Sequence, residues 1–149
     1  MALEFTLTDH TDEVLDALDE QIEAALEAVG IQCEGYAQDI VEAGVPRHGG
    51  SWYTSQGAAG LKGSITHQVK MDEKAVYVGT NNEHAIYNEF GTGIYADGGG
   101  RQSPWAYQDD EGNWHRTRGM TPLHFLKKAA ADHITEFKAI IQSILRGGS

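Results

Sequence analysis

The residues whose spacing could bind a nucleotide lie in the glycine-rich stretch 84–101. Gly91, Gly93 and Ala96 have the G-x-G-x-x-A spacing of a dinucleotide-binding fingerprint. In that motif the glycine turn follows a strand and opens a helix, so that the pyrophosphate meets the helix N-terminus. Here the residues before Gly91 have helical spacing, and Asp97 is followed by three glycines, with which no helix begins. We therefore predict no nucleotide site and interpret these glycines as a source of backbone flexibility.

The residues that could bind a metal ion do not have the required spacing. The seven histidines form no H-x-x-x-H pair and no cluster with the single cysteine. Asp109, Asp110, Glu111 and Asn113 resemble a calcium loop in composition, but the ligand spacing and the closing glutamate of an EF-hand are missing. We predict no metal and no cofactor, and we interpret these acids as keeping a turn solvated.

The candidates for catalysis are equally weak. The sequence has no G-x-S-x-G nucleophile elbow, and Cys33 falls within an amphipathic helical pattern, where a small buried side chain is expected. Glu89 and His84 are an acid and a base five residues apart, a spacing that turns them to different faces of a helix. We therefore predict that the protein is not an enzyme.

Residues 9–45 have the apolar spacing of one long amphipathic helix, which Gly44 and Pro46 end. Gly30 and Gly35 each cost about 1 kcal/mol relative to alanine, so these are the places where a kink is expected. A helix of this length extends about 50 Å at 1.5 Å per residue and overhangs a domain of this size, which indicates a partner. The apolar positions alternate in steps of three and four: Leu15, Leu18, Ile22, Ala25, Val29, Cys33, Tyr36 and Ile40.

The middle of the chain is predicted to form a loop, a hairpin and a short helix. Residues 47–60 have loop composition. Residues 64–70 and 75–79 alternate as two strands joined by a turn, with His67 as a packed or rim histidine. Residues 84–90 then repeat apolar positions at helical spacing.

The last part is predicted to contain a second hairpin and a helix. The sequences WAYQ and WHRT, residues 105–108 and 114–117, flank a turn that contains Gly112. Thr121 is a suitable cap and Pro122 a suitable first residue for a C-terminal helix. Its apolar stripe consists of Leu126, Ala130, His133, Phe137, Ile141 and Ile144.

These elements predict a single α+β domain that covers all 149 residues, with two helices packed on a small antiparallel sheet. Its parts are a long acidic helix at 9–45, a hairpin and short helix at 61–90, an extended loop and hairpin at 91–118, and a C-terminal helix at 121–146. The N-terminal residues lack the pattern of a signal peptide and no apolar run is long enough for a membrane span, so we expect a soluble protein made in the cytoplasm.

The negative charge is concentrated in the first third of the chain. Residues 1–46 contain twelve Asp and Glu and no Lys or Arg, and the net charge of the whole chain is −11. Such a segment repels the backbone of nucleic acids, so sequence-specific binding to DNA or RNA is disfavoured. One interpretation is a solvated helix face. The other is a surface that docks on a basic neighbour or prevents passing DNA from sticking, for which the candidates are Asp12, Asp16, Asp19 and Glu23.

A set of motifs between about Pro46 and Ala131 resembles, in order, the tail-component family of long-tailed phages typified by the tenth gene product of phage HK97. The positions that match are Val78-Gly79-Thr80, then Tyr87 with Glu89-Phe90-Gly91-Thr92, then Pro122 with Phe125-Leu126 and Ala129. Gly60 to Ile65 is also similar to a segment of the family. Residues 47–59 are longer and more aromatic than the short turn of the family, so the resemblance implies no role for that loop.

The resemblance implies a structural role without enzyme activity. Family members form rings, usually sixfold, at the neck where capsid meets tail, so the expected location is the virion, after assembly in the host cytoplasm. The expected partners are further copies of the chain, the head-closure or connector proteins, and the tail-terminator or tail-tube proteins. DNA would pass through such a ring, and no membrane is involved.

Within this interpretation, the stretch Glu89–Thr92 is expected to be architectural. Phe90 is expected to be buried against the last helix, Gly91 to have a backbone conformation that a side chain would strain, and Thr92 to bond nearby backbone. The loop 91–103 and the hairpin after it form the candidate assembly arm. The aromatic candidates for the interface on that arm are Trp105, Tyr107 and Trp114.

Two alternatives of other classes stay open. One is a small ligand-binding or hydrolytic domain that uses the glycine-rich loop 91–100, which a tight and saturable ligand in a soluble monomer would favour. The other is an assembly factor that leaves before the particle is finished. Its absence from purified virions would distinguish it from a neck component.

Overall fold

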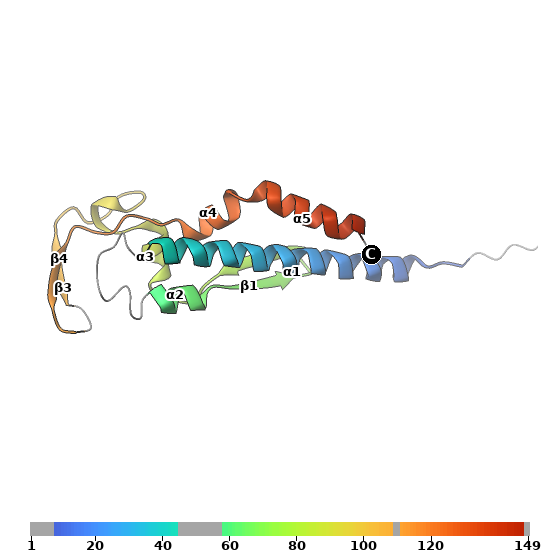
Figure 1. The fold of residues 1–149 in the computed structure, drawn as a ribbon, viewed down its shortest axis with the longest axis horizontal. Coiled ribbons are helices and arrows are strands. Elements are labelled where there is room, and N and C mark those ends of the chain that lie inside the picture. Colours follow the sequence, from blue (N-terminus) through green and yellow to red (C-terminus); the bar gives the residue numbers. More distant parts are fainter. Residues whose placement is uncertain (1–7, 45–57, 109–110, 148–149) are drawn as a thin grey trace, which may run out of the picture.

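The computed structural model describes residues 8–44, 58–108 and 111–147. The predictions made for residues 45–57, which include the stop at Pro46, and for the pair Asp109 and Asp110 lie outside the described residues. The fold is α+β, as predicted, with a long N-terminal helix, C-terminal helices and two small antiparallel sheets. The elements are arranged along one long helix, so the molecule is elongated (Figure 1).

Helix α1 (Thr11–Gly44) contains 34 residues and is continuous through both of its interior glycines. At its start the Asp9 carboxylate accepts a hydrogen bond of 2.9 Å from the Thr11 amide. Hydrogen bonds from the Thr11 hydroxyl and amide lower the pKa of the Asp9 carboxyl. Gly30 does not break the helix. It allows the neighbouring hairpin to approach, because a Cβ at this position would lie 2.6 Å from His67 Cδ2.

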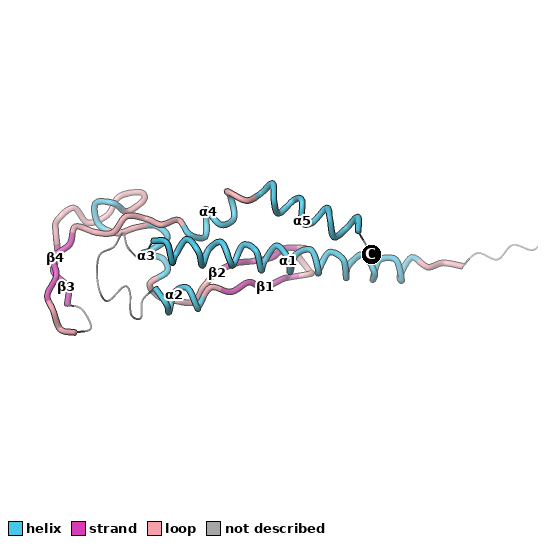
Figure 2. Tube along the Cα trace, viewed as in Figure 1, coloured by secondary structure: helices cyan, strands magenta, loops and turns pink. Residues whose placement is uncertain are grey.

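A β-hairpin packs along one side of α1 (Figure 2). Strands β1 (Thr66–Lys70) and β2 (Ala75–Gly79) pair antiparallel, with Val69 opposite Val76. Side chains alternate between half-buried and exposed along β1, and His67 and Val69 are on the half-buried face. The predicted pair of strands and their facing are therefore confirmed.

Two short helices stand before and after this hairpin in the sequence. Helix α3 (Ala85–Phe90) was predicted, but helix α2 (Ala58–Ser64) begins within the predicted loop 47–60. The loop prediction was wrong there because it relied on glycine and serine content. The burial of Leu61, one of the largest fully buried side chains, outweighs that local preference.

The C-terminal segment differs from the prediction of one helix at 121–146. It contains helix α4 (Phe125–Ala131) and helix α5 (Ile134–Gly147), and neither Thr121 nor Pro122 is helical. The residues before α4 bond instead to the region of α3, where the Leu123 amide donates to the Asn88 carbonyl at 2.7 Å. This backbone pairing between distant segments outweighs the local capping signal.

The predicted apolar stripe of this segment is confirmed except at one position, since Phe137 is buried and Leu126 and Ile141 pack against the core. Phe125 and Ala129 are buried in α4, whereas Ala130 is exposed. The next buried residue is Phe137 in α5. Both helices pack on α1, on either side of the interruption at residues 132–133.

The core lies where α1 passes between the layer of α4 and α5 and the layer of the hairpin (Figure 1). It includes the single cysteine, buried as predicted, and burial raises the pKa of that thiol. The buried residues of the core are Val29, Cys33, Ala37, Val41, Leu61, Ile65, Ala85, Leu123, Phe125, Ala129 and Phe137.

The second hairpin forms a sheet of its own at the end of the molecule where α1 terminates (Figure 2). Strands β3 (Trp105–Gln108) and β4 (Trp114–Thr117) pair antiparallel, as predicted. Gly112 in the connection has a φ of +86°, which suits a glycine. Among the described helices, none combines the length and the apolar character that crossing a membrane requires.

Candidate assembly surfaces

The start of α1 extends past the end of α5 and past the first hairpin (Figure 1), and residues 11–20 of the helix are exposed. Val14, Leu15 and Leu18 are 63, 52 and 44% exposed, although two of them belong to the predicted apolar stripe. Farther along α1 the same stripe is buried from Ala25 onward. The stripe is therefore longer than the surface that covers it, and we call its uncovered part, Val14, Leu15 and Leu18, the apolar ridge.

The four acidic residues predicted as an interface lie on α1 in steps of four, three and four, so they share one face beside this ridge. All four are exposed: Asp12, Asp16, Asp19 and Glu23. Asp19 forms an ion pair of 2.7 Å with Lys74, which lies in the turn of the first hairpin. Within the described residues, the other three have no ion-pair partner. Bases outside the acidic segment therefore neutralise part of its charge.

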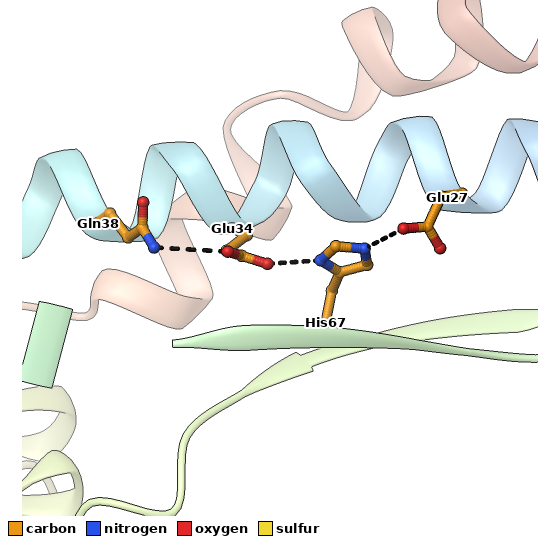
Figure 3. A network of polar contacts seen from close by, with 4 residues as sticks. All are labelled: Glu27, Glu34, Gln38 and His67. Atoms are coloured by element: carbon orange, nitrogen blue, oxygen red, sulfur yellow. Dashed lines mark hydrogen bonds and ion pairs between the residues drawn. The ribbon is translucent and has the colours of Figure 1, made fainter. Parts of the chain in front are cut away.

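A histidine links the first hairpin to the acidic helix (Figure 3). His67 on β1 lies between two glutamates of α1, with Nδ1 2.5 Å from Glu34 and Nε2 2.6 Å from Glu27. The hydrogen bond to Glu34, followed by that to Glu27, raises the pKa of the His67 imidazole above its ordinary value of 6.5. The predicted packed histidine is thus a charged contact between two layers.

This contact should make the stability of the protein depend on pH. Because the folded state favours the imidazolium, its contribution is complete below about pH 6.5 and is lost as the pH rises through the raised pKa of His67. We expect the difference in unfolding free energy between wild type and His67→Gln to be largest at about pH 6 and to shrink toward pH 8.5. Urea titrations across this range measure it, and a difference that grew with pH would contradict the charged contact.

Glu89, one of the residues of the family motif, connects α3 to the start of α4. The Glu89 side chain is 7% exposed, and its two carboxylate oxygens accept hydrogen bonds from the Leu126 and Lys127 amides at 2.9 and 3.0 Å. These are the second and third residues of α4, whose own preceding residue, His124, provides no side-chain cap. A carboxylate from another helix therefore caps α4 and meets the positive end of its dipole.

We expect Glu89→Ala to lower the free energy of unfolding by about 1–3 kcal/mol, because two amides at the start of α4 lose their acceptors. Glu89→Gln keeps one acceptor oxygen and should cost less. Glu83→Ala is the matched control, since Glu83 is an exposed acid just before α3, and it should change stability by less than about 0.5 kcal/mol. Chemical denaturation measures all three variants. Equal effects of the Glu89 and Glu83 changes would exclude the cap.

The neighbouring motif residues give mixed results. Phe90 is 52% exposed, so the prediction that it is buried against the last helix was wrong. The reason is the orientation of α3, which turns Ala85 and Glu89 inward and Phe90 outward. The strained backbone of Gly91 is confirmed, because its φ is +76° and a Cβ would lie 2.8 Å from the Met120 carbonyl. The Thr92 hydroxyl, as predicted, accepts a backbone bond, from the Met120 amide at 2.9 Å.

Gly93 and Gly119 are required where two backbone segments approach each other closely, which is a role beyond the flexibility that we inferred. The backbones of residues 92–94 and 118–120 pair closely, and the Ile94 amide donates to the Arg118 carbonyl at 3.1 Å. A Cβ on Gly93 would lie 1.9 Å from that same carbonyl oxygen, and one on Gly119 would lie 2.0 Å from the Thr92 carbonyl oxygen. Only glycine allows the two segments to approach this closely.

The other motif positions are structural or lie on the surface. Phe125 is in the core and Pro122 packs beside Gly91, while Gly79 ends β2. The hydroxyl of Thr80 lies 2.5 Å from that of Ser64, which links the end of the hairpin to α2. Tyr87, in contrast, is exposed.

An aromatic pocket of about 690 Å³ lies between the loop and the second hairpin. Two of the predicted interface residues, Trp105 and Tyr107, line it, whereas Trp114 is outside and 71% exposed. Arg101 lies over the Trp105 ring at 5.4 Å. The contribution of Tyr95 was not predicted, and its signal was its place in a loop rich in glycine and aromatic residues. The pocket is lined by His84, Tyr87, Thr92, Tyr95, Trp105, Tyr107, Thr117, Gly119, Met120 and Thr121.

A second, more apolar groove of about 500 Å³ lies on the outer side of α3 and α4, and we call it the α3–α4 groove. Ile86 and Phe90 of α3 are exposed along it, and Leu126 and Lys127 of α4 face them. The carboxylate of Glu89 also lines the groove, but it is engaged with the two amides of α4. Nothing in the sequence pattern indicated that these apolar residues would stay uncovered.

The acid–base pair considered from the sequence, Glu89 with His84, is not brought together for catalysis. The Glu89 carboxylate caps α4, so it is not oriented toward His84 as a catalytic partner. Within residues 8–44, 58–108 and 111–147, no three His, Cys, Asp or Glu side chains are arranged to hold a metal ion.

The comparisons with known proteins identify no relative. No protein-family model, no curated protein and no solved structure matches this chain.

Proposed function

We propose that this chain is a non-enzymatic structural subunit that forms a ring at the head–tail junction of a long-tailed phage and joins the tail to the capsid connector. The observation that carries the proposal is the uncovered apolar ridge on a helix that extends past its own domain. Apolar side chains that continue a buried stripe gain from burial on a neighbour. The ordered motifs from Gly79 to Phe125 support the phage assignment.

The other end of the molecule also fits an assembling subunit. The exposed Trp114, the aromatic pocket and the α3–α4 groove place apolar surface on the arm and beside it. Aromatic side chains are common in the centres of protein interfaces. A ring subunit needs two different surfaces that meet on neighbouring copies, because its contacts are heterologous and close by rotation.

Imaging of purified assemblies tests this function. We expect the chain to be present in finished particles, as a ring at the neck with sixfold symmetry, and to be monomeric or weakly associated when isolated. Presence during assembly but absence from finished particles would favour the assembly factor. Turnover of a nucleotide or an ester that required Glu89 would contradict the structural role.

The exposed acids on one face of α1 (Asp12, Asp16, Asp19 and Glu23) should then contribute through their negative charge. Its field extends about 10 Å at 0.1 M salt, and we propose that it docks on a basic rim of an adjoining ring, the alternative being a lumen that repels DNA. We expect reversal to lysine of Asp16 and Glu23, which face away from the apolar ridge, to leave the chain folded but to slow particle joining. Asp19 is left unchanged because it pairs with Lys74. Normal yields of filled, tailed particles would show that the charge only solvates the helix.

A second candidate function rests on the aromatic pocket, whose volume of about 690 Å³ is in the range of small-molecule sites. In this case a monomer would bind a ligand tightly and saturably. Trp105→Ala should then abolish binding without affecting self-association. In a ring subunit the same change should weaken assembly instead, so titration calorimetry together with sedimentation distinguishes the two functions.

A further inference from the structure

The two ends of the molecule each expose apolar side chains, with an acid beside one set and a lysine beside the other. At one end the start of α1, which carries the apolar ridge, extends past α5 and the first hairpin (Figure 1). Asp12 lies one turn before Leu15 and so borders this ridge, and it has no ion-pair partner among the described residues. The projecting surface is therefore a helix with an apolar face and an acidic edge.

At the other end, near the end of α1, the α3–α4 groove offers the matching surface. Ile86 and Phe90 of α3 are exposed and line the groove on one side. Leu126 of α4 is half-buried and also lines it. Lys127 lines the groove and Lys128 follows it, exposed on the same helix. The one acid in the groove, Glu89, is engaged by two backbone amides, so the free side-chain charge lining it is positive.

We propose that the apolar ridge of one copy docks in the α3–α4 groove of the next copy. The ridge residues Val14, Leu15 and Leu18 are spaced as the anchors of an amphipathic helix that lies in a groove. Asp12, at the edge of the ridge, would then meet Lys127 of the groove. Within one chain the ridge cannot reach its own groove, because the two lie at opposite ends of α1 (Figure 1). The acid at the edge of the ridge matches the free lysine of the groove, so we take a second copy of the chain as the occupant.

This inference rests on the proposed function, and it names the surfaces through which the ring closes. The ridge and the groove are different surfaces, so the contact is heterologous, and repetition of such a contact gives a closed ring or an open filament. The ridge is short, so we expect weak association of the isolated chain. The contact also gives a role to apolar side chains that no other described element covers.

Substitutions at the two surfaces test the contact. Leu15→Ser with Leu18→Ser, or Ile86→Ser with Phe90→Ser, should each weaken self-association by roughly 10-fold or more, as the loss of buried apolar side chains predicts. Ile31→Ser and Tyr77→Ser are matched controls, because both residues are exposed and apolar but lie outside the ridge and the groove. The controls should stay within about twofold. Sedimentation velocity measures association, and circular dichroism checks that every variant folds.

A mixing experiment distinguishes this contact from a symmetric one. The ridge variant keeps an intact groove and the groove variant keeps an intact ridge, so the two proteins should combine as a one-to-one dimer that grows no further. Native mass spectrometry detects that species. If each variant retained normal assembly alone, or if no mixed dimer formed while both variants were defective, the proposed contact would be wrong.

Substitutions of charged residues provide an independent test of the proposed contact. Asp12→Lys and Lys127→Glu should each weaken association, and their combination should restore most of it. Should the wild-type chain form the neck ring while none of these variants affects it, the inference fails but the proposed function stands. A wild-type chain that is monomeric both in concentrated solution and in particles would contradict both.

Discussion

Replacing Phe125 with alanine should lower the free energy of unfolding by about 3–5 kcal/mol, because a fully buried aromatic ring leaves a cavity when it is removed. The Phe125 side chain has no exposed surface and lies at the first turn of α4, against the core side of α1. The resulting loss is a large part of the stability of a domain of this size. Urea denaturation measures it directly.

Phe90→Ala is the matched control for this change. Phe90 lies in the same motif region and loses the same atoms, but half of its surface is already exposed. We expect a loss of less than about 1 kcal/mol in the isolated chain. The expected effect of Phe90→Ala is on association, since the residue lines the α3–α4 groove. A Phe90→Ala chain as unstable as Phe125→Ala would show that α3 is oriented differently.

Gly93→Ala should lower the free energy of unfolding by at least about 3 kcal/mol. The added Cβ would lie 1.9 Å from the Arg118 carbonyl oxygen, and no change of rotamer relieves contact with backbone. The paired segments 92–94 and 118–120 would have to separate. Their separation would also disturb Thr92 and Gly119, which line the aromatic pocket.

Gly98→Ala separates this effect from the general cost of a left-handed residue. Gly98 has a φ of +78° against +63° for Gly93, but a Cβ on Gly98 would have no atom within 4 Å beyond its own chain neighbours. The substitution should therefore cost only about 1–2 kcal/mol, the penalty of the backbone conformation alone. Similar losses for the two variants would show that the close approach of the two segments is not required for stability.

Local patterns in the sequence determined most of the secondary structure. The three-and-four spacing of Leu15 to Ile40 specified a long helix, and period-two alternation specified the strands around residues 66–70 and 75–79. These signals are reliable because helix and strand periods follow from backbone geometry alone. The glycine-rich turn at Gly112 and the strain at Gly91 also follow from local requirements.

The tertiary structure alone decided the C-terminal boundary. Thr121 and Pro122 are good local signals for a helix start, yet α4 begins at Phe125, because the segment before it pairs with residues 88–92. The cap comes from Glu89, more than thirty residues earlier in the chain. A capping partner supplied by another element leaves no spacing signature in the sequence.

Which apolar residues are covered was likewise decided by tertiary packing. Leu15 and Val29 occupy equivalent places in one periodic stripe, and only the extent of the hairpin and of α5 makes one exposed and the other buried. Phe90 and Phe125 differ for the same reason, since the orientation of α3 turns Phe90 outward. Periodicity shows which side chains share a face of a helix. Whether that face meets another element depends on contacts between residues far apart in sequence, which a single sequence does not encode in any local pattern.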